Sequence, residues 1–234
     1  MKSVSVDNTR PKNISKAAKI TLFITVPLLI LLLIFVLLPD KAEVYTNTDS
    51  ISDAIGSLLP RVIELDGISV KKQPDATTCG ITTVTVMSNY YSNTDNEVGD
   101  LLEKYGSKGN TDTAELLQKE MPGREVIFKS NVTDDAMIRD IHASLNRGNP
   151  VVVYFGAPNP FNEPYYDSHG SVVYGINLDG KTITIANSYG YSEEITLIDF
   201  MNRMSYTERD KYTSAQRFIW KFIAVNINTY ILVE

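Results

Sequence analysis

The chain has 234 residues, of which 43% are apolar and 21% charged, as is ordinary for a globular protein. It carries a net charge of −6 at pH 7, one cysteine and two histidines. One sulfur excludes an internal disulfide and is too few for a structural zinc site. The histidines are far apart and no carboxylates cluster with them, so we expect no metal site. The lone thiol is therefore either a buried apolar side chain or a nucleophile.

Residues 20–38 form an apolar run without a charged side chain. A helix of this length, at about 1.5 Å per residue, would cross the hydrocarbon layer of about 30 Å, so we expect a transmembrane anchor. Pro27 would kink this helix, which membrane helices tolerate. A buried core helix is the alternative, but the run lacks the polar face that such a helix usually has.

The residues before this run set its orientation. Residues 1–19 contain five basic side chains and one aspartate, a net charge of +4, and basic flanks stay in the cytoplasm. We therefore expect a cytoplasmic tail, a single pass through the cell membrane and an extracellular domain. The rest of the chain then carries −10, which argues against a nucleic-acid partner. A cleaved signal peptide is the alternative, but residues 39–42 make a poor cleavage site and the run is long for that role.

Residues 39–61 are polar and mixed, and we interpret them as a juxtamembrane stalk with a short helix at 51–59. Residues 62–234 then form one domain, whose first half has helical patterns and whose second half has strand patterns. The fold class is α+β. Helices are expected over 79–91, 96–105, 112–120 and 133–147, and strands over 151–155, 171–178, 182–187 and 218–228.

Cys79 is the first residue of the first of these helices, in the sequence Gln-Pro-Asp-Ala-Thr-Thr-Cys-Gly. A helix N-terminus and a nearby histidine are the surroundings that activate a thiol. Thr77 or Thr78 could cap the helix. Its first turns contain β-branched residues, which are poor helix formers, so we expect the helix to be buried in the middle of the domain.

Two further residues fit nucleophilic catalysis by that thiol. His169 precedes the strand expected over 171–178, and Asn187 ends the next one, so the hairpin returns both to one edge of a sheet. An imidazole can carry the proton and an amide can orient it. Gln73, six residues before the cysteine, could join the backbone N–H of Cys79 in stabilising an oxyanion. His142, among polar neighbours on an expected helix, is expected at the surface.

These motifs together resemble the papain-like cysteine peptidases. The closest subset resembles the bacteriocin leader peptidases, also called double-glycine peptidases, whose motif has a glutamine six residues before a Cys-Gly pair. That subset commonly has an aspartate within an Asp-Pro pair where this chain has Asn187. The sequence Asn-Ser-Tyr-Gly at 187–190 is closer to the Asn-Ser-Trp-Gly of papain. The resemblance covers about residues 62–234.

The resemblance implies a helical half, with the cysteine on a central helix, packed on an antiparallel sheet that bears the histidine and asparagine. It implies a catalytic set of Cys79, His169, Asn187 and Gln73, a peptide or protein substrate and no cofactor. The sequence thus predicts a cysteine peptidase anchored in the lipid bilayer by its N-terminal helix and facing outward. A catalytically silent domain that binds a peptide or partner is one alternative. An acyltransferase with the same residues is another, because hydrolysis and transfer share their chemistry until deacylation.

Overall fold

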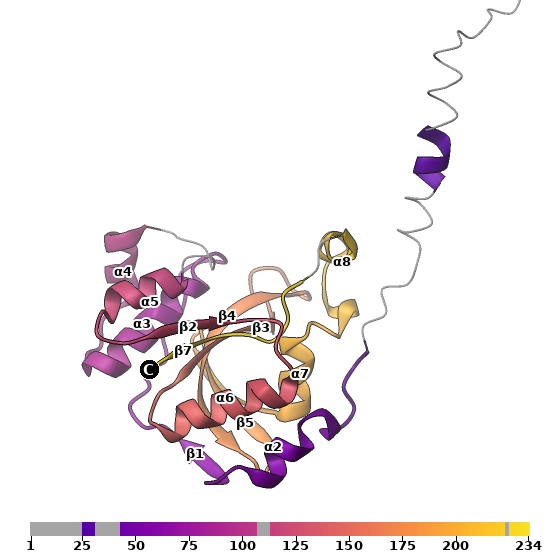
Figure 1. Ribbon diagram of the computed structural model, residues 1–234. Helices are drawn as coiled ribbons and strands as arrows, with labels where there is room; N and C mark the ends of the chain where they lie inside the picture. Colours follow the sequence, from indigo (N-terminus) through magenta and orange to yellow (C-terminus); the bar gives the residue numbers. More distant parts are fainter. Residues whose placement is uncertain (1–24, 31–42, 107–112, 223–224) are drawn as a thin grey trace, which may run out of the picture. The chain divides into compact units, whose positions relative to one another are not determined.

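The computed structural model describes residues 25–30, 43–106, 113–222 and 225–234 (Figure 1). The chain divides into two compact units, residues 1–40 and 41–234. In the first unit, residues 25–30 are helical. Most of the run expected to span a membrane lies outside the described residues. None of the helices that are described is both long and apolar enough to cross a bilayer.

An antiparallel sheet of seven strands forms the centre of the second unit. Its order is β2-β7-β3-β4-β5-β6, and β1 pairs with β4. The strands are β1 (Val62–Glu64), β2 (Val126–Lys129), β3 (Val151–Pro158), β4 (Tyr166–Asn177), β5 (Thr182–Asn187), β6 (Tyr191–Thr196) and β7 (Thr229–Val233). The helices are η1 (Asp49–Ile51), α2 (Ser52–Ser57), α3 (Cys79–Ser92), α4 (Val98–Tyr105), α5 (Thr113–Glu120), α6 (Asp134–Asn146), α7 (Leu197–Met204), η3 (Arg209–Lys211) and α8 (Ser214–Phe222).

Helices cover both faces of this sheet, and side chains alternate between the faces along each strand. On β3, Val151, Val153 and Phe155 enter one hydrophobic cluster, to which α2, α6 and α7 also contribute. Val152 and Tyr154 enter a second cluster, with α3, α4 and α5. Figure 1 shows α3, α4 and α5 gathered on one side of the sheet and α2, α6 and α7 on the other. The α+β class with an antiparallel sheet is confirmed.

Helix α3 is buried along most of its length, as its poor helix formers led us to expect. Every residue from Cys79 to Asn89 is buried. Three threonine hydroxyls donate to backbone carbonyls three or four residues back: Thr82 to Thr78 at 2.9 Å, Thr83 to Gly80 at 2.7 Å and Thr85 to Ile81 at 2.9 Å. The hydroxyls are therefore satisfied within the helix, and β-branched side chains can fill the space beside the sheet.

The segment that we interpreted as a stalk adds buried residues to the second unit, which begins at Lys41. Ile51 and Ala54 are fully buried and belong to the cluster shared with α6 and α7. The backbone of Tyr45 exchanges two hydrogen bonds with the side chain of Asn202 on α7, at 2.8 and 3.0 Å. This segment is thus held by hydrophobic packing and by hydrogen bonds.

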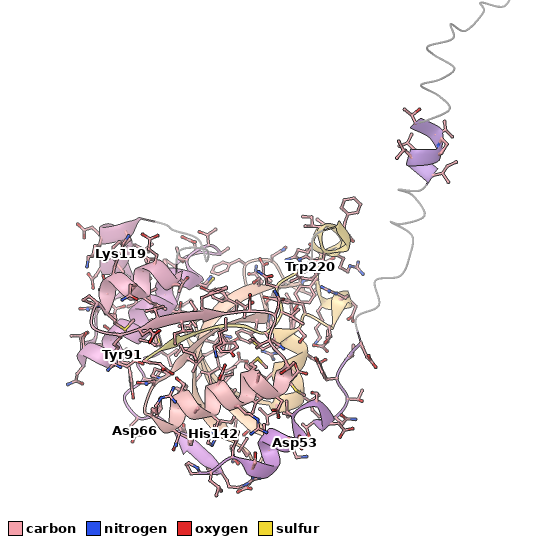
Figure 2. All side chains as sticks on the ribbon, in the orientation of Figure 1. Asp53, Asp66, Tyr91, Lys119, His142 and Trp220 are labelled. Atoms are coloured by element: carbon pink, nitrogen blue, oxygen red, sulfur yellow. The ribbon has the colours of Figure 1, made fainter. Side chains whose placement is uncertain are left out.

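Two expectations for the domain were wrong. Residues 218–228 do not form one strand: α8 extends to Phe222, and β7 begins only at Thr229. The aromatic and β-branched residues that favoured a strand lie partly exposed on α8, while Trp220 packs edge-on against Tyr212 with ring centroids 4.8 Å apart. Figure 2 shows Trp220 on this helix.

His142 is buried, not at the surface. Figure 2 labels its position on α6. Its Nε2 donates to the carbonyl of Pro60 at 2.8 Å, because a carbonyl can only accept. Pro60, the residue that accepts this hydrogen bond, lies more than eighty positions away in the sequence. The polar neighbours of His142 on α6 therefore gave a misleading prediction.

Replacing Ile51 with alanine should lower the free energy of unfolding of the full-length chain by about 2–5 kcal/mol, because it leaves a cavity in a packed core. Urea unfolding followed by the fluorescence of Trp220, the single tryptophan, measures this change. Leu59→Ala is the matched control, since Leu59 is 72% exposed and its loss should change stability by less than about 0.5 kcal/mol. Equal, small effects of both substitutions would mean that residues 43–59 do not stabilise the fold.

Candidate active site

The β4–β5 hairpin brings His169 and Asn187 together. Ser171 is the register partner of Asn187, and His169 lies two residues before Ser171 on the same face of β4. His169 and Asn187 are therefore diagonal neighbours, within reach of each other. Nε2 of His169 lies 2.8 Å from Oδ1 of Asn187. Strand β4 begins at Tyr166, so His169 lies within the strand and not before it.

The bond to Asn187 determines which ring nitrogen of His169 is free to accept a proton. Because an amide oxygen only accepts hydrogen bonds, Nε2 carries the hydrogen and Nδ1 keeps the lone pair in the neutral ring. Burial lowers the pKa of His169 to about 4, and the bond to Asn187 opposes this shift only in part. His169 is therefore neutral at pH 7, ready to act as a base. If a thiol lies beside this ring, its activation would require proton transfer to the neutral ring, because no imidazolium is present at pH 7.

Tyr189 holds the ring of His169 in place. The two rings are stacked, with centroids 3.8 Å apart and an interplanar angle of 14°. The backbone N–H of Tyr189 donates to Oδ1 of Asn187 at 3.0 Å, the same atom that accepts from His169. Phe161, from the loop between β3 and β4, makes an edge contact with the ring of Tyr189. Tyr189 thus restricts the orientation of the His169 ring.

Cys79 is the first residue of α3 and is buried. The preceding residue, Thr78, does not cap the helix with its side chain. Its hydroxyl instead accepts from the N–H of Asp75 at 3.3 Å and donates to the carbonyl of the same residue at 3.1 Å. The thiol thus lies at a helix N-terminus whose first amides are not capped by that hydroxyl, a setting that favours negative charge.

Two observations relate Cys79 to the histidine. Gly170, next to His169, lies so close to α3 that a Cβ there would be 3.6 Å from Cγ2 of Thr83, about one turn beyond Cys79. Burial raises the pKa of Tyr189, and the charges of Asp167 and Cys79 add to this effect. The thiol therefore lies within electrostatic reach of the ring that stacks on His169.

Gln73 is joined to the same turn through its backbone. Its N–H donates to the carbonyl of Ser188 at 2.7 Å, and the adjacent Lys72 forms a β-bridge with Tyr189. Its side chain is buried, with Nε2 donating to the carbonyl of Asp75 at 2.6 Å. Among the described residues, Oε1 has no hydrogen-bond partner. One of the two Nε2 hydrogens is used by Asp75, and the second remains for another acceptor.

A cavity of about 440 Å³ has Ser168, the residue before His169 on β4, in its wall. The hydroxyls of Ser168 and Tyr206 lie 2.9 Å apart, and burial raises the pKa of Tyr206 to about 12. Most of the wall is aromatic or aliphatic, which suits an apolar side chain. The lining residues are Ala114, Phe128, Tyr154, Ser168, Tyr206, Trp220, Val225, Asn226, Thr229 and Ile231.

Sequence reasoning named the four candidate residues but missed several that surround them. Glu193 accepts from Nδ2 of Asn187 at 2.8 Å, and Arg203 contacts Glu193 at 3.3 Å. The sequence offered one signal here, the N-cap residue Thr196 of the helix that bears Arg203, but none for the strand that bears Glu193. In the described part of the chain, no group of three or more His, Cys, Asp or Glu is arranged to bind a metal ion.

The depressed pKa of His169 predicts a pH dependence of stability. The folded protein binds this proton less well than the unfolded chain, whose pKa is near 6.5, so stability is lost as the pH falls from about 6.5 towards 4. Between pH 7 and pH 5 the loss should be about 2 kcal/mol. The measurement compares the free energies of unfolding of the wild type and His169→Gln at both pH values. If the difference in the free energy of unfolding between the two proteins is the same at pH 7 and pH 5, the conclusion that His169 is buried in its neutral form is contradicted.

No curated protein matches the chain. Among solved structures, a Bacillus anthracis protein described as a C39-like peptidase is 13% identical, with a TM-score of 0.46, covering 74% of this chain and 97% of its own. Xylellain, a cysteine protease from Xylella fastidiosa, is 12% identical, with a TM-score of 0.45, covering 84% of this chain and 94% of its own.

The model of the Peptidase_C39 like family matches residues 65–214, which is more than half of the chain. This match confirms the resemblance that the motifs indicated, and the matched range contains all four candidate residues. The chain therefore belongs to the Peptidase_C39 like family and contains a cysteine-peptidase-like domain.

Proposed function

We propose that the domain is an active cysteine peptidase in which Cys79 is the nucleophile, His169 the base and Asn187 the residue that orients the base. The observation that supports this most is the 2.8 Å bond between Nε2 of His169 and Oδ1 of Asn187. A buried histidine whose pKa is lowered to about 4 is neutral at physiological pH, and its Nδ1 is then a free proton acceptor.

The first half of the reaction is acylation. Nδ1 of His169 takes the proton of the Cys79 thiol, and Sγ attacks the carbonyl carbon of the scissile peptide. The oxyanion accepts hydrogen bonds from the backbone N–H of Cys79 and from the second hydrogen on Nε2 of Gln73. The protonated His169 then gives its proton to the leaving amine, the C–N bond breaks, and a thioester to Cys79 remains.

Deacylation completes the cycle. His169 takes a proton from a water molecule, the hydroxide attacks the thioester carbonyl, and the thiol leaves with its proton restored. An amine in place of the water would give acyl transfer with the same residues. The cavity beside Ser168 is where a substrate side chain would lie next to the reacting carbonyl, and its lining favours an apolar one.

The apolar run at 20–38 and its basic flank support the further proposal that the domain is held at the outer face of the cell membrane. The substrate would then be a peptide or protein that reaches this surface.

Substitutions of the four residues test the mechanism. We expect Cys79→Ala and His169→Ala to abolish activity, and Gln73→Ala to slow it by about 10²- to 10³-fold, because one oxyanion donor is lost. Asn187→Ala should have a smaller effect than His169→Ala, because it only orients the ring. The measurement is the rate at which biotinylated peptidyl acyloxymethyl ketones, differing in peptide sequence, label the full-length chain, followed by mass spectrometry of the modified residue.

Gln118→Ala is the control for Gln73→Ala, because Gln118 also donates its amide to a backbone carbonyl but lies exposed on α5. It should label at the wild-type rate. Folded protein that no probe labels at Cys79 would favour the catalytically silent binding domain. Labelling at the same rate in wild type, His169→Ala and Asn187→Ala would contradict the assignment of the three residues.

Protease treatment of intact cells tests the membrane arrangement. We expect added protease to digest the domain and to spare a tag placed before residue 20, because the basic flank keeps the N-terminus inside. The readout is immunoblotting of the tag and of the domain. A protected domain would contradict the outward orientation, and a soluble domain fragment beginning near Glu43 would contradict the uncleaved anchor.

A further inference from the structure

A carboxylate lies behind Asn187, on the opposite side from His169. Oδ1 of Asn187 accepts from Nε2 of His169 at 2.8 Å and from the N–H of Tyr189 at 3.0 Å. Nδ2 donates to Oε1 of Glu193 at 2.8 Å and to the hydroxyl of Tyr191 at 3.3 Å. The two ends of the amide thus face two kinds of partner, donors on one side and a carboxylate on the other.

This arrangement allows only one orientation of the amide. A carboxylate can accept but cannot donate, so Glu193 must face the NH₂ end of Asn187. If the amide turned over, Oδ1 would face the carboxylate, and Nδ2 would face two N–H groups. Both contacts would then be repulsive and the buried polar groups would lose their partners.

Glu193 is itself fixed by an arginine. Its other oxygen, Oε2, lies 3.3 Å from Arg203, which also binds Asp199 at 2.8 Å. The side chains of Glu193 and Arg203 are only 15% and 10% exposed, so the pair is largely shielded from water and salt. The guanidinium also lies over the ring of Phe155, 5.8 Å from its centroid. The carboxylate therefore has a defined position.

The structure assigns Glu193, held by Arg203, as a positioning residue that fixes the Asn187 amide so that its oxygen faces His169. This inference rests on the proposed function, because the orientation of His169 matters for turnover only if that residue is the base. Glu193 does not touch the reacting atoms, and its effect must pass through Asn187. Removing it should lower the rate of the chemical step by about 10- to 100-fold, because a small displacement of a catalytic group has effects of this size.

The test uses Glu193→Gln in the full-length chain in detergent. Glutamine keeps the size of the side chain but replaces an obligatory acceptor with an amide that can face Asn187 either way. We expect the maximal rate of labelling by a peptidyl acyloxymethyl ketone to fall by about 10- to 100-fold, with little change in the half-saturating probe concentration.

Glu194→Gln is the matched control. Glu194 is the next residue on β6, so its side chain points to the other face of the sheet, where it accepts from the hydroxyl of Thr182. It should label like the wild type. In an Asn187→Ala background, Glu193→Gln should have no further effect on rate, because the residue through which it acts is absent. If Glu193 had only a structural role, the losses of labelling rate in the two single variants would add up in the double variant.

A second measurement does not need activity. Labelling the histidines with ¹⁵N makes the Nε2–H resonances of His169 and His142 observable. The resonance that disappears in His169→Gln is the one of His169. The His169 resonance should exchange with water faster in Glu193→Gln than in wild type, while that of His142, bonded to Pro60, stays unchanged.

If the wild type is never labelled, the proposed function fails, and the exchange measurement alone decides the positioning role. An exchange rate in Glu193→Gln equal to that in Glu194→Gln would overturn it, whatever the labelling shows.

Discussion

The register of β4 against β5 is the constraint on which the candidate site depends. Because Ser171 lies opposite Asn187, the alternation of side chains puts His169 on the same face as Asn187 and one diagonal step away. A slip of one residue would turn every side chain of one strand to the other face and separate the pair. The register also directs Val172 and Val173 into the two opposite hydrophobic clusters, so core packing and the site require the same alignment.

The site is buried, and its polar side chains form a chain of contacts. His169 bonds to Asn187, Asn187 bonds to Glu193, and Glu193 contacts Arg203. In surroundings of low dielectric constant each of these bonds is stronger than in water, and an unpaired group would be costly. Two exceptions among the described residues of the site are Oε1 of Gln73 and Nε of Arg203, which are buried without a hydrogen-bond partner. A buried polar atom without a partner is uncommon, and a catalytic role of the kind proposed for Gln73 is one explanation for it.

Local patterns predicted the elements that carry the site. Helix α3 and strand β5 were expected over 79–91 and 182–187, and their observed bounds agree closely with these ranges. Strands β1, β2 and β6 were not predicted. They are short, and β6 alternates exposed and half-buried residues, so its sequence has no hydrophobic stripe that distinguishes it from a loop.

The other errors arise from contacts between residues far apart in the sequence. We expected His142 at the surface because of its polar neighbours, but it is buried and donates to the carbonyl of Pro60. The aromatic residues near the C-terminus suggested a strand, whereas Trp220 packs onto rings that precede α8 and leaves the rest of that helix partly exposed. The role of Glu193 depends on Arg203, ten residues away on the next helix. No periodicity within either element indicates that contact.

Helix α7 has a practical consequence for the preparation of this domain. Asn202 holds the backbone of Tyr45, and the adjacent Arg203 holds Glu193 behind Asn187. A soluble fragment begun at Val62, the boundary that the sequence suggested, would remove Ile51 and Ala54 from the core and leave the side chain of Asn202 without its backbone partner. Weak activity in such a fragment would then report a loosened helix rather than the chemistry of the intact chain. A fragment that begins at Lys41 keeps these contacts, and it is the shorter form in which a labelling result can be compared with that of the whole protein.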